Sequence, residues 1–289
     1  MRTLTTPRME QDTKTSGEPD LRLALPSRAE NVALVRRALS GVVDVLDLGK
    51  ARLLDINAAV SEACNNVVVH AYEGAEGPMD VHLWIQPTDL EVVVSDHGVG
   101  IRPNVPEPDL EVQGLGLSLI QALTDRAEFL GGMGEGTRVR MNFAVENGSK
   151  ELSDGARRDD PEAPPPPGEL SIAVSSGPLA APVLGRVIAM LAARAEFSLE
   201  GISEAELVTD AVAAHAPRSI VGNRIQLGID RPDGQLVVRV GPLEEGGATR
   251  VVQASALADL PPVLERLTQD RSVESAGEGE LLCLVLGPR

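Results

Sequence analysis

Residues 55–72 read DINAAVSEACNNVVVHAY, and the order of apolar and polar residues in this stretch decides the fold prediction. Apolar residues recur at helical spacing and form a stripe wide enough for a helix that packs on a sheet. The stripe consists of Val60, Ala63, Val67 and Ala71. Glu62, Asn66 and His70 follow one another at intervals of four, so they share a second face of the same predicted helix.

This polar face carries groups that suit phosphate chemistry. Asn65 and Asn66 stand inside the predicted helix although Asn is a weak helix former, so helix propensity does not explain them. Glu62 lies one turn from Asn66, which pairs a candidate general base with an oxygen ligand for Mg²⁺. A solvated helix face has the same kind of pattern, so this segment alone leaves both interpretations open.

Composition restricts the class of partner. The chain has 289 residues, enough for about two domains, and its formal net charge is -17. This charge opposes phosphate backbones and anionic membranes, and 2% aromatic residues leave few side chains for stacking nucleobases. We therefore expect no nucleic-acid and no membrane partner, whereas a basic protein or a nucleotide in a locally neutralised pocket stays compatible.

The start of the chain and its cysteines indicate a cytoplasmic protein. The first twenty residues contain no apolar stretch of the signal-peptide kind, and the longest apolar runs are too short to span a bilayer. Cys64 and Cys283 lack metal-type spacing and fall in separate predicted domains, so we treat both as small apolar residues.

The order of predicted elements occurs twice along the chain. The first set begins with a strand at 21–25 and the second with a strand at 170–174, and each continues into two helices. The second helix of each set carries a histidine, His70 or His215. Three further segments align in the same order, which indicates a duplicated unit.

The duplication divides the chain into four predicted parts. These are a disordered N-terminus (1–20), a first domain (21–146), a Pro-rich linker (147–168) and a degenerate second domain (169–289). In the alignment of the two units, the opposed pairs are Glu62 and Leu207, Asn66 and Ala211, Asp96 and Pro242, and Thr137 and Glu280. The second unit therefore keeps the apolar scaffold and has lost the polar site.

A first glycine segment follows the predicted strand 90–95. Asp96 is placed at the strand end to accept a hydrogen bond from an exocyclic amine, and Gly98 and Gly100 allow the backbone to turn and approach a ligand. An ordinary turn after a strand fits the same residues equally well.

A second segment, GLGLSLIQALTDRA at 114–127, places Gly114 and Gly116 before a predicted helix with Leu117, Ile120, Leu123 and Ala127 on its buried stripe. The free N–H groups and the dipole of such a helix favour an anion such as a triphosphate. Neither glycine pair fits the dinucleotide motif, and no P-loop pattern is present in the sequence.

Taken together, four sequence features resemble the ordered boxes of the GHKL ATPase superfamily. They are the polar face 62–70, the segment 96–100, the segment 114–116 and the pair Gly136–Thr137. Within the superfamily, EACNNVVVHAY and GLGLSLIQALTDRAEF are most similar to the anti-sigma factor serine/threonine-protein kinases of bacterial partner switches. The resemblance covers residues 21–146 and implies an α+β fold, a two-layer α/β sandwich of the Bergerat ATP-binding type, here in tandem with a degenerate second copy.

The resemblance also implies roles for the matching positions. Asn66 is similar to the Mg²⁺ ligand, Glu62 to the base that acts on the acceptor, and Asp96 to the residue that reads adenine, with Thr137 in support. The hinges and phosphate-facing turns of a short lid are matched by Gly98, Gly100, Gly114, Leu115 and Gly116.

The function implied is that of an ATP- and Mg²⁺-dependent protein serine/threonine kinase and anti-sigma factor. Its partners would be an anti-anti-sigma protein of the STAS-domain type and a sigma factor. The alternative is an ATP-binding regulatory module that controls a protein partner without phosphotransfer. Because related kinases act as dimers, we expect either a homodimer or a pseudo-dimer in which the second domain supplies the other half.

Overall fold

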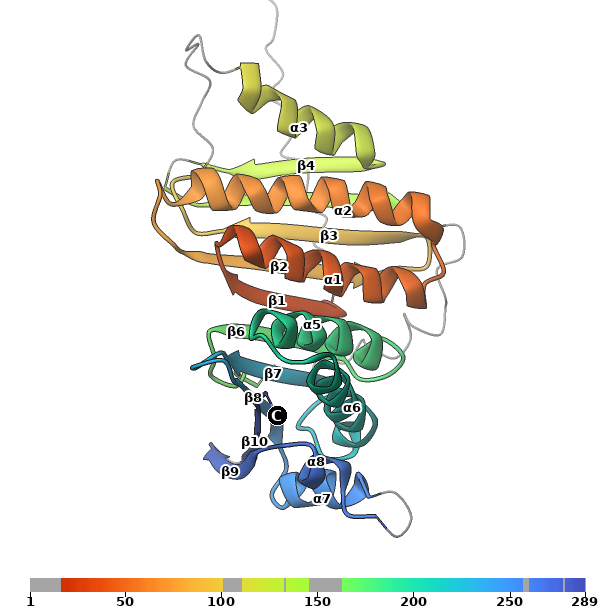
Figure 1. Ribbon diagram of the computed structural model, residues 1–289. Helices are drawn as coiled ribbons and strands as arrows, with labels where there is room; N and C mark the ends of the chain where they lie inside the picture. The colour runs from red at the N-terminus through yellow and green to blue at the C-terminus, as the bar shows by residue number, and fades with distance from the viewer. Residues whose placement is uncertain are drawn as a thin grey trace, which may run out of the picture.

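Ten antiparallel strands form one continuous sheet, and helices α1, α2 and α5 lie side by side over one of its faces (Figure 1). The computed structural model describes residues 17–100, 111–132, 134–145, 163–256, 260–277 and 279–288. In the first half, the strands are β1 (Leu21–Pro26), β2 (Pro78–Ile85), β3 (Asp89–Asp96), β4 (Arg126–Gly131) and β5 (Thr137–Ala144). In the second half, they are β6 (Leu170–Ser175), β7 (Arg224–Asp230), β8 (Leu236–Leu243), β9 (Asp270–Ala276) and β10 (Gly279–Leu286).

The helices follow the strands in a similar order in both halves. The first half contains α1 (Ala29–Val45), α2 (Gly49–Asn66), the π-helical turn η1 (Val67–Ala71) and α3 (Glu111–Leu123). The second half contains α5 (Ala180–Arg194), α6 (Leu199–His215), the 3₁₀ turn η2 (Ala216–Arg218), α7 (Gly247–Ala254) and α8 (Val263–Arg266). The mixed sheet-and-helix architecture confirms the predicted α+β fold.

The core lies between the sheet and the helices, as the apolar periodicity predicts. Leu21, Leu23 and Leu25 alternate with partly exposed residues along β1 and are buried. The predicted apolar stripe of residues 55–72 is also confirmed, since Val60, Ala63, Val67 and Ala71 are all buried. Both cysteines are buried and unpaired, so their treatment as small apolar residues is confirmed.

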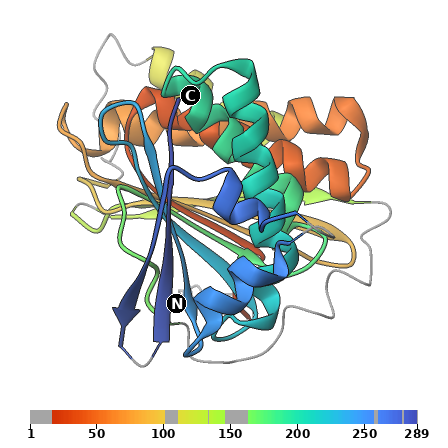
Figure 2. The ribbon, with the colours of Figure 1, turned by 60° about the horizontal axis from the view of Figure 1, so that its bottom comes forward.

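The strand order is mirrored about the pair formed by β1 and β6. The complete order is β4-β5-β3-β2-β1-β6-β7-β8-β10-β9, so each half runs outward from its own first strand in the same sequence. Leu21 pairs with Val174 and Leu23 with Ile172 across the centre. Figure 2 shows the sheet twisting between the two halves. The arrangement is compatible with a duplicated unit, which stays a prediction because strand order alone does not establish a common origin.

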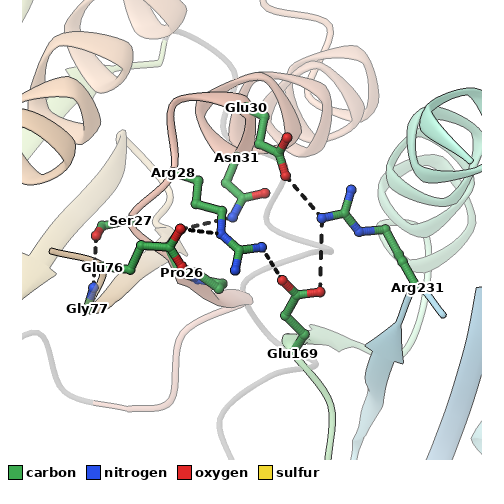
Figure 3. Close-up of polar contacts among 9 residues, drawn as sticks. All are labelled: Pro26, Ser27, Arg28, Glu30, Asn31, Glu76, Gly77, Glu169 and Arg231. Carbon is green, nitrogen blue, oxygen red and sulfur yellow. Dashed lines mark hydrogen bonds and ion pairs between the residues drawn. The ribbon is translucent and has the colours of Figure 1, made fainter. Parts of the chain in front are cut away.

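Helices and charged side chains also join the two halves. Where α1 crosses α5, a Cβ atom on Gly41 would lie 2.8 Å from the carbonyl oxygen of Pro182, so only glycine allows this close approach. At the N-terminal end of α1, Arg28 pairs with Glu76 at 2.9 Å and with Glu169 of the second half (Figure 3). A second ion pair has its arginine in the second half and its glutamate in the first, since Arg231 pairs with Glu30 at 3.0 Å.

The end of the predicted linker packs on the sheet. Residues 146–162 lie outside the described part of the chain, but Pro166 is buried. Arg239 of β8 donates a hydrogen bond to the carbonyl oxygen of Pro167 at 3.2 Å, and a Cβ atom on Gly228 would lie 2.2 Å from the same oxygen. The linker bounds stay a prediction, and the last residues of this segment dock on the sheet where Gly228 of β7 has no side chain.

Helix α3 differs from its prediction at both ends. It begins at Glu111, so Gly114 and Gly116 lie inside the helix and not before it. It ends at Leu123, and Ala127, predicted on its buried stripe, belongs to β4. Ile120 is fully buried as predicted, whereas Leu117 is 42% exposed. Within the described residues, no helix has the length and apolar character that crossing a membrane requires.

Candidate functional site

Asp96 ends β3 and is the most buried polar residue of the predicted site, with 5% of its surface exposed. Its Oδ1 atom accepts hydrogen bonds from the backbone N–H groups of Gly98 at 2.8 Å and Thr137 at 3.2 Å. Thr137 comes next to Asp96 because β3 and β5 pair in a register that joins Ser95 with Arg138. Both bonds use Oδ1, and among the described residues Oδ2 accepts none, which leaves an acceptor for a ligand.

Glycines surround Asp96 because backbone segments meet there at very short range. Gly136 has a φ of +73°, and a Cβ atom on it would lie 2.1 Å from the carbonyl oxygen of Asp96. Gly100 has a φ of +75°, and its Cβ atom would lie 1.9 Å from the carbonyl oxygen of Gly132. A side chain at either position would push the two turns apart, so the glycines hold the strand ends together.

The Asp96 turn also docks on the end of the helix that carries Glu62 and Asn66. The α-helix changes into the π-helical turn at Val67, and this turn ends at Ala71. The carbonyl oxygen of Ala71 accepts a hydrogen bond from the N–H group of Val99 at 2.9 Å. A Cβ atom on Gly98 would lie 2.0 Å from this oxygen, so Gly98 permits the contact by lacking a side chain. A π-turn in a functional segment is a known association.

A second contact joins α2 with α3. A Cβ atom on Gly116 would lie 2.1 Å from Oε1 of Glu62, so the carboxylate rests on the bare backbone of α3. Asn66, one turn further along α2, is partly exposed and makes no side-chain hydrogen bond to the described residues. The carboxamide is therefore available to a ligand. Gly114 and Leu115 lie in the first turns of α3, but the side chain of Leu115 is outside the described part of the chain.

Three neighbouring residues, His70, His97 and Cys64, are less closely tied to this site. His70 is exposed, and the wider π-turn interrupts the spacing of four that places it in line with Glu62 and Asn66. His97 is exposed, with its Nε2 atom 3.7 Å from Asp80. Burial raises the pKa of the Cys64 thiol to about 12, so this cysteine stays protonated and is not a nucleophile.

Sequence reasoning missed Tyr72 as a member of the site. Its hydroxyl oxygen accepts a hydrogen bond from the N–H group of His97 at 3.0 Å and donates one to the carbonyl oxygen of Pro78. The available signal was its rarity, since Tyr72 is the only tyrosine in the chain and directly follows the polar helix. Gly136 appears in the quoted motif, but its steric role against Asp96 depends on strand pairing that the sequence does not display.

Known proteins resemble the half of the chain that carries this site. Residues 25–143 match the family profile described as the histidine kinase-like ATPase domain. The serine-protein kinase RsbW of Bacillus mycoides is 31% identical over 138 residues, which cover 44% of this chain and 85% of that protein. The anti-sigma F factor of Clostridium kluyveri is 28% identical over 130 residues, which cover 42% of this chain and 91% of that protein.

A solved structure is also similar to part of the chain. The blue-light activated histidine kinase of Erythrobacter litoralis matches with a TM-score of 0.31 and 22% identity, covering 39% of this chain and 41% of that chain. An overlay this loose adds nothing to the assignment, which depends on the family profile and on the relatives. The chain belongs to the histidine kinase-like ATPase family, in the group that contains the RsbW serine-protein kinases and anti-sigma F factors.

Proposed function

We propose that this protein is an ATP-dependent protein serine/threonine kinase and anti-sigma factor of a partner-switching system. Its phosphate acceptor would be a serine on an anti-anti-sigma protein of the STAS-domain type, and its other partner a sigma factor. The names of the relatives support the reaction class and the anti-sigma role. The observation that carries the proposal is the buried Asp96 carboxylate with one unused oxygen beside a glycine turn.

Asp96 has the chemistry to recognise an adenine base. Oδ1 is held by two backbone N–H groups, so the carboxylate keeps one orientation, and Oδ2 can accept a hydrogen bond from the exocyclic amine. Thr137 and Gly98 hold Asp96 through their backbone, and Gly100 closes the turn against Gly132. Oδ2 is not among the fully buried side-chain atoms without a partner, so a ligand N–H group can reach it and form a charge-assisted hydrogen bond.

The phosphates and their metal ion would lie toward α2 and α3. Asn66 supplies one oxygen ligand, and no group of three or more His, Cys, Asp or Glu residues in the described ranges is arranged to hold a metal. This donor set fits Mg²⁺ that arrives with the triphosphate, because Mg²⁺ usually binds few protein ligands and keeps phosphate oxygens and water. Such an ion would neutralise charge on the phosphates. Gly114, Leu115 and Gly116 contribute the phosphate-facing part of α3.

Glu62 is the proposed catalytic base. Its carboxylate rests on Gly116, which fixes the side chain between the two helices. From there it would accept the proton of the incoming serine hydroxyl, while the backbone of α3 and Asn66 hold the donor in place. Phosphoryl transfer depends mainly on how the reacting groups are positioned and how their charge is stabilised. By fixing the Glu62 carboxylate against the backbone of α3, the protein would hold the base in the geometry that the transfer requires.

The experiment follows the γ-phosphate of labelled ATP onto a purified STAS-domain protein from the same genome. Glu62→Gln should retain ATP binding and lose phosphotransfer, whereas the matched control Glu206→Gln, an exposed position on α6, should transfer at the normal rate. Unchanged transfer by Glu62→Gln would remove Glu62 as the base. Nucleotide-dependent binding of the partner without any labelling by the unaltered protein would favour the regulatory module instead.

We further propose that the second half binds no nucleotide. Glu280 stands opposite Thr137 in the predicted alignment, and its carboxylate accepts hydrogen bonds from the N–H groups of Gly246 at 2.9 Å and Ala248 at 3.2 Å. The acid thus caps the N-terminus of α7 and is not available to a ligand. Calorimetry on the full chain should give one ATP per chain; two sites per chain would contradict the proposal.

The pairing of β1 with β6 further supports a pseudo-dimer within one chain. This pairing and the crossing of α1 with α5 already use the edge and the helix face through which a first half could join a second copy. We expect the full chain to remain a monomer of 30.4 kDa in light scattering at micromolar concentration. A stable homodimer formed through β1 would contradict this expectation.

A further inference from the structure

The hydroxyl of Tyr72 stands between the ends of two neighbouring strands. β2 and β3 pair up to Met79 and Asp96, which is their last pair at this end. The next residues along the two strands are Pro78 and His97. Between these two, the Tyr72 oxygen accepts a hydrogen bond from the His97 N–H group at 3.0 Å and donates one to the Pro78 carbonyl oxygen.

The hydroxyl therefore replaces a direct backbone bond between the strands. One hydroxyl provides a donor and an acceptor, so it satisfies both the N–H group of His97 and the carbonyl of Pro78. The link between these two residues passes through the hydroxyl oxygen, so removing this oxygen removes two hydrogen bonds directly beside the turn in which Gly98 binds Oδ1.

The aromatic ring of Tyr72 is fixed by packing, in addition to the hydrogen bonds of its hydroxyl. A Cβ atom on Gly77 would lie 2.3 Å from Cε1 of Tyr72, so the ring packs directly on the glycine backbone. Burial raises the pKa of Tyr72 above its ordinary value, so the hydroxyl keeps the proton that it donates to Pro78. The preceding residue, Ala71, accepts a hydrogen bond from Val99 in the turn that follows Asp96. Two adjacent residues therefore hold this turn in place.

We propose that Tyr72 is a positioning residue for nucleotide recognition: its hydroxyl sets the spacing of the β2 and β3 ends and thereby aims Asp96 at the base. The inference depends on the proposed function, because it needs Asp96 to read the exocyclic amine of ATP. Tyr72 touches neither Glu62 nor Asn66 in the described contacts, so it acts on base recognition and not on the phosphoryl transfer step.

The test measures the affinity of the full chain for ATP and for inosine triphosphate, which lacks the exocyclic amine. Tyr72→Phe should weaken ATP binding about tenfold, because a displaced Asp96 loses its hydrogen bond to the exocyclic amine. The affinity for inosine triphosphate should stay almost unchanged, since this nucleotide has no such amine. The preference for ATP should therefore shrink, while kcat at saturating ATP stays unchanged. The matched control is Ser27→Ala, which removes a hydroxyl that binds the Gly77 N–H group at 3.0 Å on the same turn without touching His97.

Gly77→Ala provides a second variant in case Tyr72→Phe does not fold. Its added Cβ atom pushes the ring while the hydroxyl is retained, so it should reduce the preference for ATP in the same way. Folded variants that keep the normal ratio of ATP to inosine triphosphate affinity would overturn the role of Tyr72. If the unaltered protein binds both nucleotides equally, the proposed role of Asp96 is itself refuted, so the two failures are distinguishable.

Discussion

Replacing Gly116 with alanine should separate the chemistry of Glu62 from the stability of the fold. The new Cβ atom would lie 2.1 Å from Oε1 of Glu62, whereas ordinary contacts begin at 3.4 Å. The carboxylate must therefore retreat by roughly 1 Å, a displacement that costs about a hundredfold in rate when the group takes part in the reaction.

The expected effect on stability is small for two opposing reasons. Oε1 is the end of a flexible side chain, and moving Glu62 out of its preferred rotamer costs about 1 kcal/mol. Alanine inside α3 is a better helix former than glycine and returns about 1 kcal/mol. The free energy of unfolding of Gly116→Ala should therefore stay within about 1 kcal/mol of the unaltered protein.

Gly98→Ala is the matched contrast. Its Cβ atom would lie 2.0 Å from the carbonyl oxygen of Ala71, a backbone atom that cannot rotate away and that already binds Val99. Overpacking of this kind costs about 1–3 kcal/mol of stability. The variant should also weaken ATP binding, because the turn that orients Asp96 is displaced.

The assay combines urea unfolding with single-turnover transfer of labelled phosphate at saturating ATP, so that binding and chemistry are measured apart. Gly116→Ala should be stable and slow, and Gly98→Ala should be less stable and weaker in ATP binding. A fully active Gly116→Ala protein would refute the reasoning, because the carboxylate would then be free to move without consequence. If both variants lost the same stability, the reasoning would also fail, because a flexible side chain at Gly116 and a fixed backbone oxygen at Gly98 should respond differently to the added Cβ atom.

Three further predictions concern stability and reactivity. Gly41→Ala should lower the free energy of unfolding by about 1–3 kcal/mol because its Cβ atom meets the backbone of α5, whereas the control Gly185→Ala, with nothing within 4 Å, should be neutral or stabilising in the same urea unfolding assay. Asp125 has its pKa lowered by the Ala144 N–H group and by Arg52, so it contributes stability above the ordinary carboxyl pKa and loses this contribution as pH falls. Asp125→Asn should therefore destabilise the protein by under about 1 kcal/mol at pH 7, because the side chain is half exposed, and this effect should shrink as the pH falls below the ordinary carboxyl pKa. Cys64 should react with iodoacetamide only after unfolding, as followed by mass spectrometry, and rapid labelling of the folded protein at pH 8 would contradict its burial.

Local patterns in the sequence were sufficient where burial follows a regular period. The stripe of residues 60–71 is buried as predicted and residues 21–25 form the predicted strand, because a helix or strand that packs on one side has one buried side. The same reasoning failed at the start of α3. Glycine usually ends helices, but Gly116 is kept inside one because the carboxylate of Glu62 occupies the space of its side chain.

The sequence by itself determined the apolar periods, the order of the motifs and the residue types that suit a nucleotide. Only the tertiary structure decided which backbone atoms meet: Gly98 with Ala71, Gly136 with Asp96, and the Tyr72 hydroxyl with two strand ends. These contacts join residues that come together through strand register and helix docking. Periodicity tells which side of an element is buried, but it does not tell which distant segment lies against it.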